Sequence, residues 1–245
     1  MTQPYLLFQL YGPMVSWGDI AVGEVRPSYN RPSKSAILGL VAGALGIRRE
    51  WDELHRELAE SLNLGLFVES PGSTLRDYHT AQVPRGKRAR GLPTRRDELE
   101  YGKTETTLTD REYLCDAYVV AALWRPEDAG QWDLEELKEA LASPTFTPFL
   151  GRKSCPSALP FAPTLQRAQT LRAAVEGSPF PDSSILDLLD AGGDIQVYWE
   201  GDSDQGFDDL EVWEERRRDD PVSRQRWQFR ERPEKLASIS PNEIH

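Results

Sequence analysis

Cationic side chains gather in one stretch of an otherwise acidic chain. Residues 75–117 open with Leu75-Arg76-Asp77-Tyr78-His79-Thr80 and close with Arg111-Glu112-Tyr113-Leu114-Cys115-Asp116-Ala117, and the interior follows neither a helical nor an alternating apolar period. The first half of this interior carries cations and no acid, at Arg85, Lys87, Arg88, Arg90, Arg95 and Arg96. Because the chain has a formal net charge of -11, this local reversal of charge favours a polyanionic partner. The alternative is a solvated basic loop without a ligand.

A second candidate for phosphate chemistry lies at residues 144–156. This segment is too rich in proline for a helix, and it places the aromatic Phe149 near Arg152, Lys153 and Ser154. Proteins that bind single-stranded RNA commonly stack a base on an aromatic ring and hold its phosphate with a neighbouring cation. The pattern therefore predicts a nucleic-acid contact in this segment.

A third candidate is the start of a helix predicted to run from Ser33 or Ser35 to Leu45, with Gly46 as its end. Its first turn combines free backbone N–H groups with Lys34, Ser35 and the preceding Arg31. That combination suits a phosphate, because the N-terminus of a helix attracts anions. Ordinary helix capping is the alternative that the sequence leaves open.

The apolar patterns predict the elements that position these candidates. Strands are predicted at residues 5–10, 64–68, 75–80 and 113–124, and amphipathic helices follow Ser33, Trp51 and Asp133. The order is strand, helix, helix, strand, strand, long excursion, strand, helix. Without the extra helix, this is most of a ferredoxin-like (RRM-like) β-α-β-β-α-β unit, so the predicted fold class is α+β. Many unrelated proteins share that fold, so it leaves function open.

The chain is predicted to have two parts. Residues 1–156 form the ferredoxin-like palm, and the excursion at about 80–110 forms a thumb insertion held between neighbouring strands. Residues 157–245 form a smaller, irregular β-rich lobe, with a helix near 183–189, a strand at 194–199 and a strand pair of mixed charge around 217–229. The tail after Pro233 is predicted to be unstructured.

Composition argues against several classes of protein. The longest apolar run, at residues 36–47, is interrupted by glycines and falls short of the roughly 20 residues of a membrane helix. With no signal peptide predicted at Met1, we expect a cytoplasmic protein. Cys115 and Cys155 are far apart and favour two reduced thiols over a disulfide or zinc site. The three histidines, His55, His79 and His245, have no metal-ligand spacing, so no metal and no cofactor is predicted.

Five short motifs follow one another along most of the chain. They are Gly12-Pro13-Met14 with Trp17-Gly18; Arg26-Pro27 followed by Pro32-Ser33-Lys34-Ser35 and by Gly39-Leu40 through Leu45-Gly46-Ile47; Leu75 to Thr80; Arg111 to Ala117; and Pro148 to Pro156. Together they resemble the CasD family of CRISPR Cascade subunits, which are RAMP-type proteins of type I-E-like systems. The resemblance is weakest in the C-terminal part and absent from the interior of the basic stretch.

The resemblance implies a role in antiviral defence. A protein of this family is a non-catalytic RNA-binding subunit of a ribonucleoprotein complex, in which it caps the 5′ handle of the CRISPR RNA. The implied protein partners are the backbone subunit CasC and the large PAM-reading subunit CasA, with target DNA near its PAM-proximal end. Base pairing with the guide reads the target sequence, while the protein supplies shape, charge and anchoring.

Roles follow by matched position. The resemblance implies that Arg111 reaches among the handle bases and that Phe149 lies beside the handle. The other implied RNA-binding residues are Arg152, Lys153, Ser154, Lys34, Ser35 and Arg76. Cations of the thumb would line the RNA as well, at Arg85, Lys87, Arg88 and Arg90.

Two other functions stay open at this stage. Some relatives are metal-independent endoribonucleases that process CRISPR repeat RNA, and His79, Tyr78 and Arg76 offer a base, an acid and a cation for that reaction. However, neighbouring strand residues point to opposite faces, so Tyr78 and His79 are not expected to converge on one phosphate. The third hypothesis is an acidic interaction domain with no RNA role, which would make the basic stretch an accident.

Overall fold

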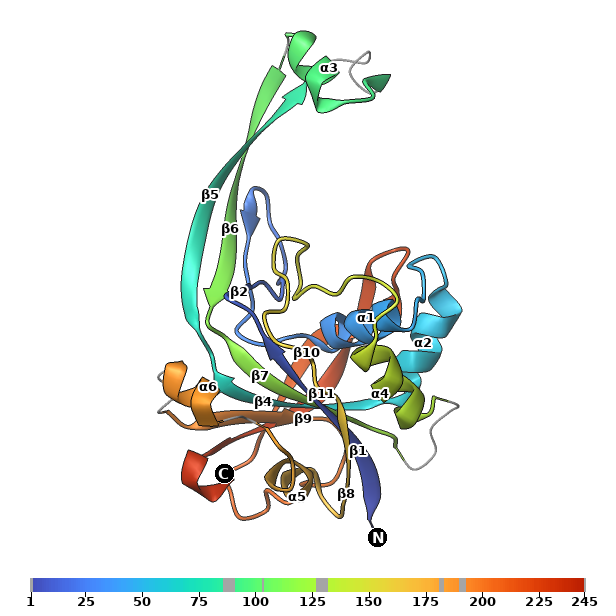
Figure 1. Ribbon diagram of the computed structural model, residues 1–245, viewed down its shortest axis with the longest axis vertical. Coiled ribbons are helices and arrows are strands. Elements are labelled where there is room, and N and C mark those ends of the chain that lie inside the picture. The colour runs from blue at the N-terminus through green and yellow to red at the C-terminus, as the bar shows by residue number, and fades with distance from the viewer. Residues whose placement is uncertain are drawn as a thin grey trace.

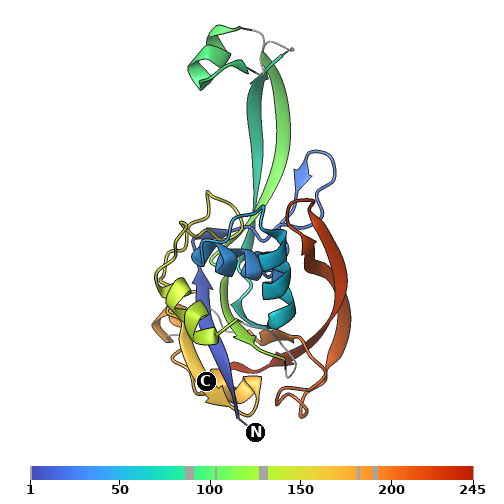
Figure 2. The same ribbon diagram turned by 90° about the vertical axis from the view of Figure 1, so that its right-hand side faces the viewer.

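A seven-stranded antiparallel sheet forms the body of the protein, and a long two-stranded ribbon projects from it (Figure 1 and Figure 2). This computed structural model describes residues 2–85, 91–102, 104–126, 132–180, 183–189 and 193–244. Within these ranges, no helix has the length and apolar character to cross a membrane. The α+β class predicted from the sequence is confirmed.

The central sheet joins strands from both ends of the chain. Its spatial order is β10-β11-β9-β4-β7-β1-β8. The strands are β1 (Gln3–Tyr11), β4 (Asn63–Ser70), β7 (Tyr118–Trp124), β8 (Thr164–Ala168), β9 (Ile195–Trp199), β10 (Trp213–Ser223) and β11 (Gln228–Ile239). Because β1 and β4 both run antiparallel to β7, the two are parallel to each other, as a connection through helices requires.

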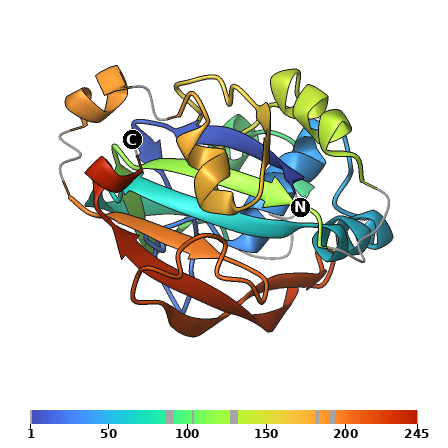
Figure 3. The ribbon, with the colours of Figure 1, turned by 90° about the horizontal axis from the view of Figure 1, so that it is seen from below.

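Both faces of this sheet are buried. Along β1, Leu6, Phe8 and Leu10 face one core while Tyr5 and Leu7 face the other, as the two-residue period of a strand dictates. Helices cover the two faces (Figure 3), and full burial of each large apolar side chain contributes roughly 1.5–3 kcal/mol. The first face carries α1 (Lys34–Ala44), α2 (Asp52–Ser61) and α4 (Leu134–Ala142), whereas α5 (Leu171–Glu176) and the aromatic Phe207 lie on the second. A further helix, α6, spans Ser183–Leu188.

The three long helices agree with the sequence predictions. Ser33, rather than Ser35, caps α1, and its hydroxyl accepts a hydrogen bond of 3.0 Å from the backbone N–H of Ala36. Gly46 follows the helix with a φ of 77°, a left-handed conformation that glycine adopts without strain. Asp133 caps α4 in the predicted way. Local capping and apolar period were therefore sufficient signals for these helices.

The thumb is a β-ribbon rather than the aperiodic excursion predicted. Its strands β5 (Ser73–Pro84) and β6 (Thr104–Cys115) pair in continuous antiparallel register, and the short helix α3 (Arg95–Glu100) lies at its tip (Figure 1). The two short strands β2 (Met14–Val15) and β3 (Val25–Arg26) also pair with β6, near the base of the ribbon. Most side chains of the outer ribbon are exposed on both faces, so no alternating apolar pattern marked its strands in the sequence.

The ribbon bends away from the central sheet at two positions. The strand predicted over residues 113–124 is in fact two strands, β6 and β7, separated at Asp116, whose φ is 59°. On the neighbouring strand pair, Gly72 has a φ of 70° and lies so close to the Cys115 carbonyl that a side chain there would overlap it. These left-handed residues redirect both strands, so the ribbon leaves the body as a unit.

The C-terminal prediction is partly wrong. The tail after Pro233 is ordered: β11 continues to Ile239, the side chains of Ala237 and Ile239 are buried, and a single 3₁₀ turn, η2 (Pro241–Glu243), follows. Residues 157–245, predicted as a separate lobe, add β8 to one edge of the central sheet and β9, β10 and β11 to the other. In β11, polar residues alternate with apolar ones, so the sequence did not indicate a buried strand. In the structure, several of its charged side chains are buried inside the protein.

A buried network of charges joins α1 to the C-terminal hairpin. Arg232 on β11 contacts Asp219 at 2.7 Å, Glu234 at 2.6 Å and Glu200 at 3.4 Å. The network extends to α1, because Lys34 Nζ lies 3.0 Å from Glu200 and the Lys34 backbone N–H donates to the Asp219 carboxylate over 2.8 Å. Burial alone would raise the pKa of Asp219, but the charge and hydrogen bonds of Arg232 outweigh it, so this pKa is lowered. The Asp219 carboxylate therefore stays ionised inside the protein.

We expect Arg232→Ala to lower the free energy of unfolding by about 3–5 kcal/mol, because removing one partner leaves buried carboxylates without compensation. Urea denaturation followed by circular dichroism measures this change. Arg226→Ala, at an exposed position of the turn between β10 and β11, is the matched control and should stay within about 0.5 kcal/mol of wild type. A loss of less than 1 kcal/mol in Arg232→Ala would contradict the structural role assigned to the network.

Candidate nucleic-acid interface

The base of the ribbon presents two different faces. In the β5–β6 register, Arg76 lies opposite Glu112, Asp77 opposite Arg111 and Tyr78 opposite Asp110. Directly paired residues of an antiparallel pair share a face, so Asp77 and Arg111 lie on one face while Arg76 and Tyr78 lie on the other. Arg76 donates to the Glu112 carboxylate over 2.7 Å; this hydrogen bond is the main reason that the pKa of Glu112 is lowered.

The three residues considered for RNA cleavage are not brought together. Arg76 and Tyr78 share one face of β5, whereas His79 lies on the other, opposite Thr109 of β6. His79 Nδ1 is 3.7 Å from Asp77 Oδ2, on its own strand. This arrangement gives no common position at which a base and an acid could act on one phosphate.

Arg111 sits in the middle of the small sheet, half-buried between β5 and β3. Within the described part of the chain, its guanidinium forms no hydrogen bond or ion pair. Two residues further along the same face, the ring of Tyr113 lies under Arg152, with the guanidinium carbon 4.9 Å from the ring centre. Arg111 and Arg152 therefore belong to one continuous cationic face at the base of the ribbon.

The loop at residues 144–156 is extended and tightly held. Its backbone is tied to neighbouring segments: Ser16 N–H donates to the Leu150 carbonyl over 3.1 Å, and Thr145 N–H donates to the Ala44 carbonyl over 2.9 Å. Leu150 is fully buried, while Phe149 is 40% exposed and Lys153 and Ser154 are exposed. The predicted RNA-binding residues of this loop are thus on the surface of a fixed scaffold.

Arg152 is the most constrained cation of this loop. One of its nitrogens, Nη2, donates to the Arg26 carbonyl over 3.2 Å, whereas Nη1 is buried without a hydrogen-bond partner in the described structure. A buried N–H group without an acceptor is unfavourable, and single nitrogens of Arg31, Arg224 and Arg232 are in the same situation.

The structure does not support the phosphate site that was predicted at the start of α1. Lys34 is buried and paired with Glu200, and the Asp219 carboxylate already accepts from the Lys34 backbone N–H. Arg31 is also buried, between Glu215 and Glu234. An internal carboxylate therefore occupies the position where the sequence suggested an external anion. Ser35 is half-buried, and its hydroxyl contacts that of Ser33 at 2.9 Å.

The thumb cations have varied placements. Arg85 is exposed, and Lys87, Arg88 and Arg90 lie outside the described residues. At the tip, Arg95 donates to the Gln82 carbonyl over 2.6 Å and contacts Glu98 at 2.7 Å, so it fastens α3 to the ribbon.

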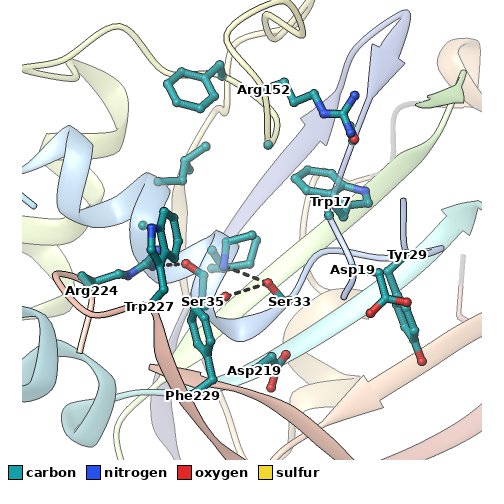
Figure 4. A pocket seen from close by; sticks show the side chains of 18 of the residues that line it. Trp17, Asp19, Tyr29, Ser33, Ser35, Arg152, Asp219, Arg224, Trp227 and Phe229 are labelled. Atoms are coloured by element: carbon teal, nitrogen blue, oxygen red, sulfur yellow. Dashed lines mark hydrogen bonds between the residues drawn. The ribbon is translucent and has the colours of Figure 1, made fainter. Parts of the chain in front are cut away.

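A large groove, of 1580 Å³, lies between α1, the loop at 144–156 and the β10–β11 hairpin (Figure 4). Sequence reasoning missed its C-terminal wall. That wall contributes Arg216, Arg218, Arg224, Trp227 and Phe229. The only signal in the sequence was a mixed-charge strand pair, and nothing local indicates that this pair packs against α1. Among the described residues, no group of three or more His, Cys, Asp or Glu side chains is arranged to hold a metal ion.

Comparisons with known proteins agree with one another. The family model described as CRISPR-associated protein (Cas_Cas5) matches residues 5–233. The CRISPR system Cascade subunit CasD of Escherichia coli (strain K12) is 34% identical over 200 residues, which are 78% of this chain and 80% of CasD. These matches confirm the resemblance to CasD that the five motifs indicated.

Two solved structures share the fold. One, described as a CRISPR RNA-guided surveillance complex, has a TM-score of 0.61 and 24% identity and covers 97% of this chain and 92% of its own. The other, described as a Cas protein, has a TM-score of 0.59 and 24% identity and covers 98% of this chain and 97% of its own. The common architecture therefore extends over nearly the whole chain.

Gly151→Ala should distort the loop that carries Phe149 and Arg152. Gly151 has a φ of 86°, and a methyl group there would overlap the Ser16 carbonyl oxygen, so we expect a loss of at least about 1 kcal/mol of stability. Thermal unfolding measures it. The control is Gly43→Ala in α1, where no atom lies within 4 Å of the added carbon; it should be neutral or stabilising. Equal melting temperatures for wild type and Gly151→Ala would contradict this role for the glycine.

Proposed function

Because the chain belongs to the CRISPR-associated (Cas_Cas5) protein family, we propose that it is a non-catalytic RNA-binding subunit of a Cascade-type surveillance complex. The observation that carries the proposal is the 34% identity to CasD over 78% of the chain. Its chemistry is anchoring: the subunit holds the 5′ handle of the CRISPR RNA, while the guide pairs with the target.

The cationic face at the base of the ribbon supports handle binding. Arg111 has no internal partner in the described structure, so its guanidinium is free to donate to base edges or phosphates. Phe149 offers an exposed ring for stacking, and Lys153 offers a flexible positive charge nearby in the loop. A scaffold fixed by backbone hydrogen bonds presents these groups without a large ordering cost.

We interpret the palm as ferredoxin-like. The four neighbouring strands β8-β1-β7-β4, with α1 and α2 after β1 and α4 after β7, follow the order β-α-β-β-α-β along the chain. The ribbon then becomes an insertion between the second and third strands of that unit. This topology supports the thumb-and-palm description that the CasD resemblance implied.

The projecting ribbon and the acidic body suit a subunit of a larger assembly. A ribbon with both faces exposed has little to stabilise it beyond its own hydrogen bonds, so partners should pack on it. We propose the backbone subunit CasC for the thumb, and CasA with PAM-proximal target DNA for neighbouring surfaces. Net negative charge elsewhere would discourage indiscriminate binding to phosphates.

Repeat-RNA cleavage is the less favoured function. Tyr78 and His79 lie on opposite faces of β5, and Arg76 is engaged with Glu112. Family membership also supports an assembly subunit rather than a nuclease.

In complexes assembled from the full chain and its partner subunits, Arg111→Ala should weaken retention of CRISPR RNA by about tenfold. If Arg111 contacts a phosphate, the slope of log affinity against log salt concentration should also fall by about one unit. Filter binding at several salt concentrations measures both quantities. The control is Arg95→Ala, which removes a thumb arginine already engaged with Glu98 and should have a smaller effect. Identical assembly of wild-type and Arg111→Ala complexes on CRISPR RNA would contradict the RNA-binding role proposed for Arg111.

RNA should stay intact when the full chain is incubated with labelled CRISPR repeat RNA in EDTA, and it should shift chiefly when the partner subunits are added. One gel reads both mobility and cleavage. Cleavage that disappears in His79→Ala would overturn the non-catalytic proposal and identify a metal-independent processing nuclease. Absence of any shift, even with all partners present, would count against RNA binding itself.

A further inference from the structure

The turn between β10 and β11 is held firmly over the helical face of the sheet. The Asp52 carboxylate, at the start of α2, accepts hydrogen bonds from the backbone N–H groups of Arg224 at 2.9 Å and Gln225 at 3.0 Å, as well as from the Ser223 hydroxyl. The Ser223 hydrogen bond is the main cause of the lowered pKa of Asp52, so the carboxylate is ionised at neutral pH. The turn is therefore a built feature, and it fixes where its side chains point.

Arg224 extends from this turn across α1. Its guanidinium donates to the Ser35 carbonyl and lies over Gly39, where an added methyl carbon would be 2.8 Å from Nη2. Glycine at position 39 thus makes room for the arginine on the helix surface. Burial and the neighbouring charge of Arg49 lower the pKa of Arg224 to about 10, so the side chain remains a cation at neutral pH.

Nothing in the described structure neutralises that cation. No carboxylate of the described residues lies within ion-pair distance of Arg224, and its Nε is buried without a hydrogen-bond partner. A desolvated charge without a counter-charge is strongly unfavourable, and an unsatisfied N–H adds to the cost. Within the described residues, the hydrogen bond to the Ser35 carbonyl is what compensates this buried cation.

Arg152 faces the same groove from the opposite wall, and its Nη1 is likewise buried without an acceptor (Figure 4). Two acids also line the groove, but Asp219 is already bound to Arg232, and Asp19 is exposed on the neighbouring loop. The arginines around the groove are Arg26, Arg152, Arg216, Arg217, Arg218 and Arg224. A group with several acceptor oxygens and negative charge, such as a phosphodiester, complements the positive charge of this lining.

Aromatic rings alternate with these cations. On the hairpin, Trp227 is 60% exposed and its ring centre lies 6.2 Å from that of Phe229. Arg49 packs at 4.1 Å from the Trp227 ring centre and holds the indole in place. On the opposite wall, Phe146 and Phe149 are 44% and 40% exposed. A cationic groove interleaved with exposed rings is the pattern of single-stranded nucleic-acid binding.

The dimensions and continuity of the groove also favour RNA. Its 1580 Å³ exceeds the roughly 300–1,000 Å³ of a small-molecule pocket, so it suits a segment of a chain. Arg152 belongs both to this groove and to the face that carries Arg111, because it also packs on Tyr113. An RNA strand bound at Arg111 can therefore continue past Arg152 into the groove.

We propose that the groove between α1, the 144–156 loop and the β10–β11 hairpin is a second site for the CRISPR RNA. Arg224 binds a phosphodiester there, and the Trp227–Phe229 pair stacks a base. The proposal rests on the RNA-binding function proposed above, and it adds a C-terminal contact that the sequence motifs did not indicate.

Affinity measurements on paired variants test this site. The full chain is assembled with its partner subunits on labelled CRISPR RNA, and retention is measured at several salt concentrations. We expect Arg224→Gln to weaken binding about tenfold and to lower the salt slope by about one unit. Trp227→Ala should weaken binding about fivefold or more with the salt slope unchanged, since stacking involves no counterion. Crosslinking from 4-thiouridine-substituted RNA should label the peptide that contains Trp227 and Phe229.

Matched controls come from the same hairpin. Arg226→Gln removes an exposed charge from the same turn, and Trp213→Ala removes an exposed tryptophan from the other end of β10; both should bind within about twofold of wild type. Gly39→Ala tests the same site independently, in case Arg224→Gln fails to fold. It improves the helix propensity of α1 while displacing the guanidinium, so it should weaken RNA binding without loss of thermal stability.

The outcomes separate the two proposals. If wild-type complexes retain no RNA, the proposed function fails as a whole. If wild type binds and the Arg224, Trp227 and Gly39 variants bind like the controls, the groove proposal is overturned while the proposed function stands. Variants that keep RNA but lose a partner subunit would also overturn it, because the groove would then be a protein-docking site.

Discussion

The buried charges between α1 and the C-terminal hairpin are the interaction on which the arrangement of the protein depends. Arg232 holds Asp219, Glu234 and Glu200 together, and Lys34 and Arg31 connect this group to the start of α1. Buried ion pairs contribute little net stability compared with apolar packing, but they tolerate only one geometry. The network therefore acts mainly as a register device: it fixes the β10–β11 hairpin beside α1 and thereby forms the C-terminal wall of the groove. The internal carboxylates also occupy the N-terminus of α1, where the sequence suggested an external anion.

A second constraint separates the body from the ribbon. Strands β4 and β7 are buried on both faces, whereas the outer parts of β5 and β6, which continue from them, are exposed on both faces. Left-handed backbone at Gly72 and Asp116 makes the change of direction at the same level on both strands. The ribbon is consequently rooted in strands that are buried on both faces. Arg111 lies near that root, where β2, β3 and β5 all pair with β6, so its backbone is part of the small sheet.

Elements with a clear cap or a regular apolar period were the ones that the sequence predicted best, whereas the short helix α5 was missed although its apolar side chains are buried. Capping residues and apolar period indicated the two helices that Ser33 and Asp133 cap, and an apolar run indicated the strand at residues 5–10. The thumb has no such period because both faces of its ribbon are polar. The part of β11 after Pro233 was predicted to be unstructured, because nothing local indicates that a charged residue such as Glu234 is buried in a network. The same limit applied to the site: Phe149 and Arg152 belong to a local motif, but Arg224 meets Ser35 across the fold, and no local pattern encodes that contact.

The two unsatisfied arginines bear on how such a subunit binds RNA. Arg224 is already positioned and largely desolvated before any ligand arrives, and one nitrogen of the partly exposed Arg152 is buried as well. The protein therefore bears the desolvation cost during folding, and a phosphate that enters the groove gains a charge-assisted contact without paying it again. The proposed ligand is a single strand, because its bases are free to stack on the exposed rings that line the groove. Under the groove proposal, the shape of the groove would favour a single-stranded handle, and contacts to bases would fall to residues such as Arg111 on the adjoining face.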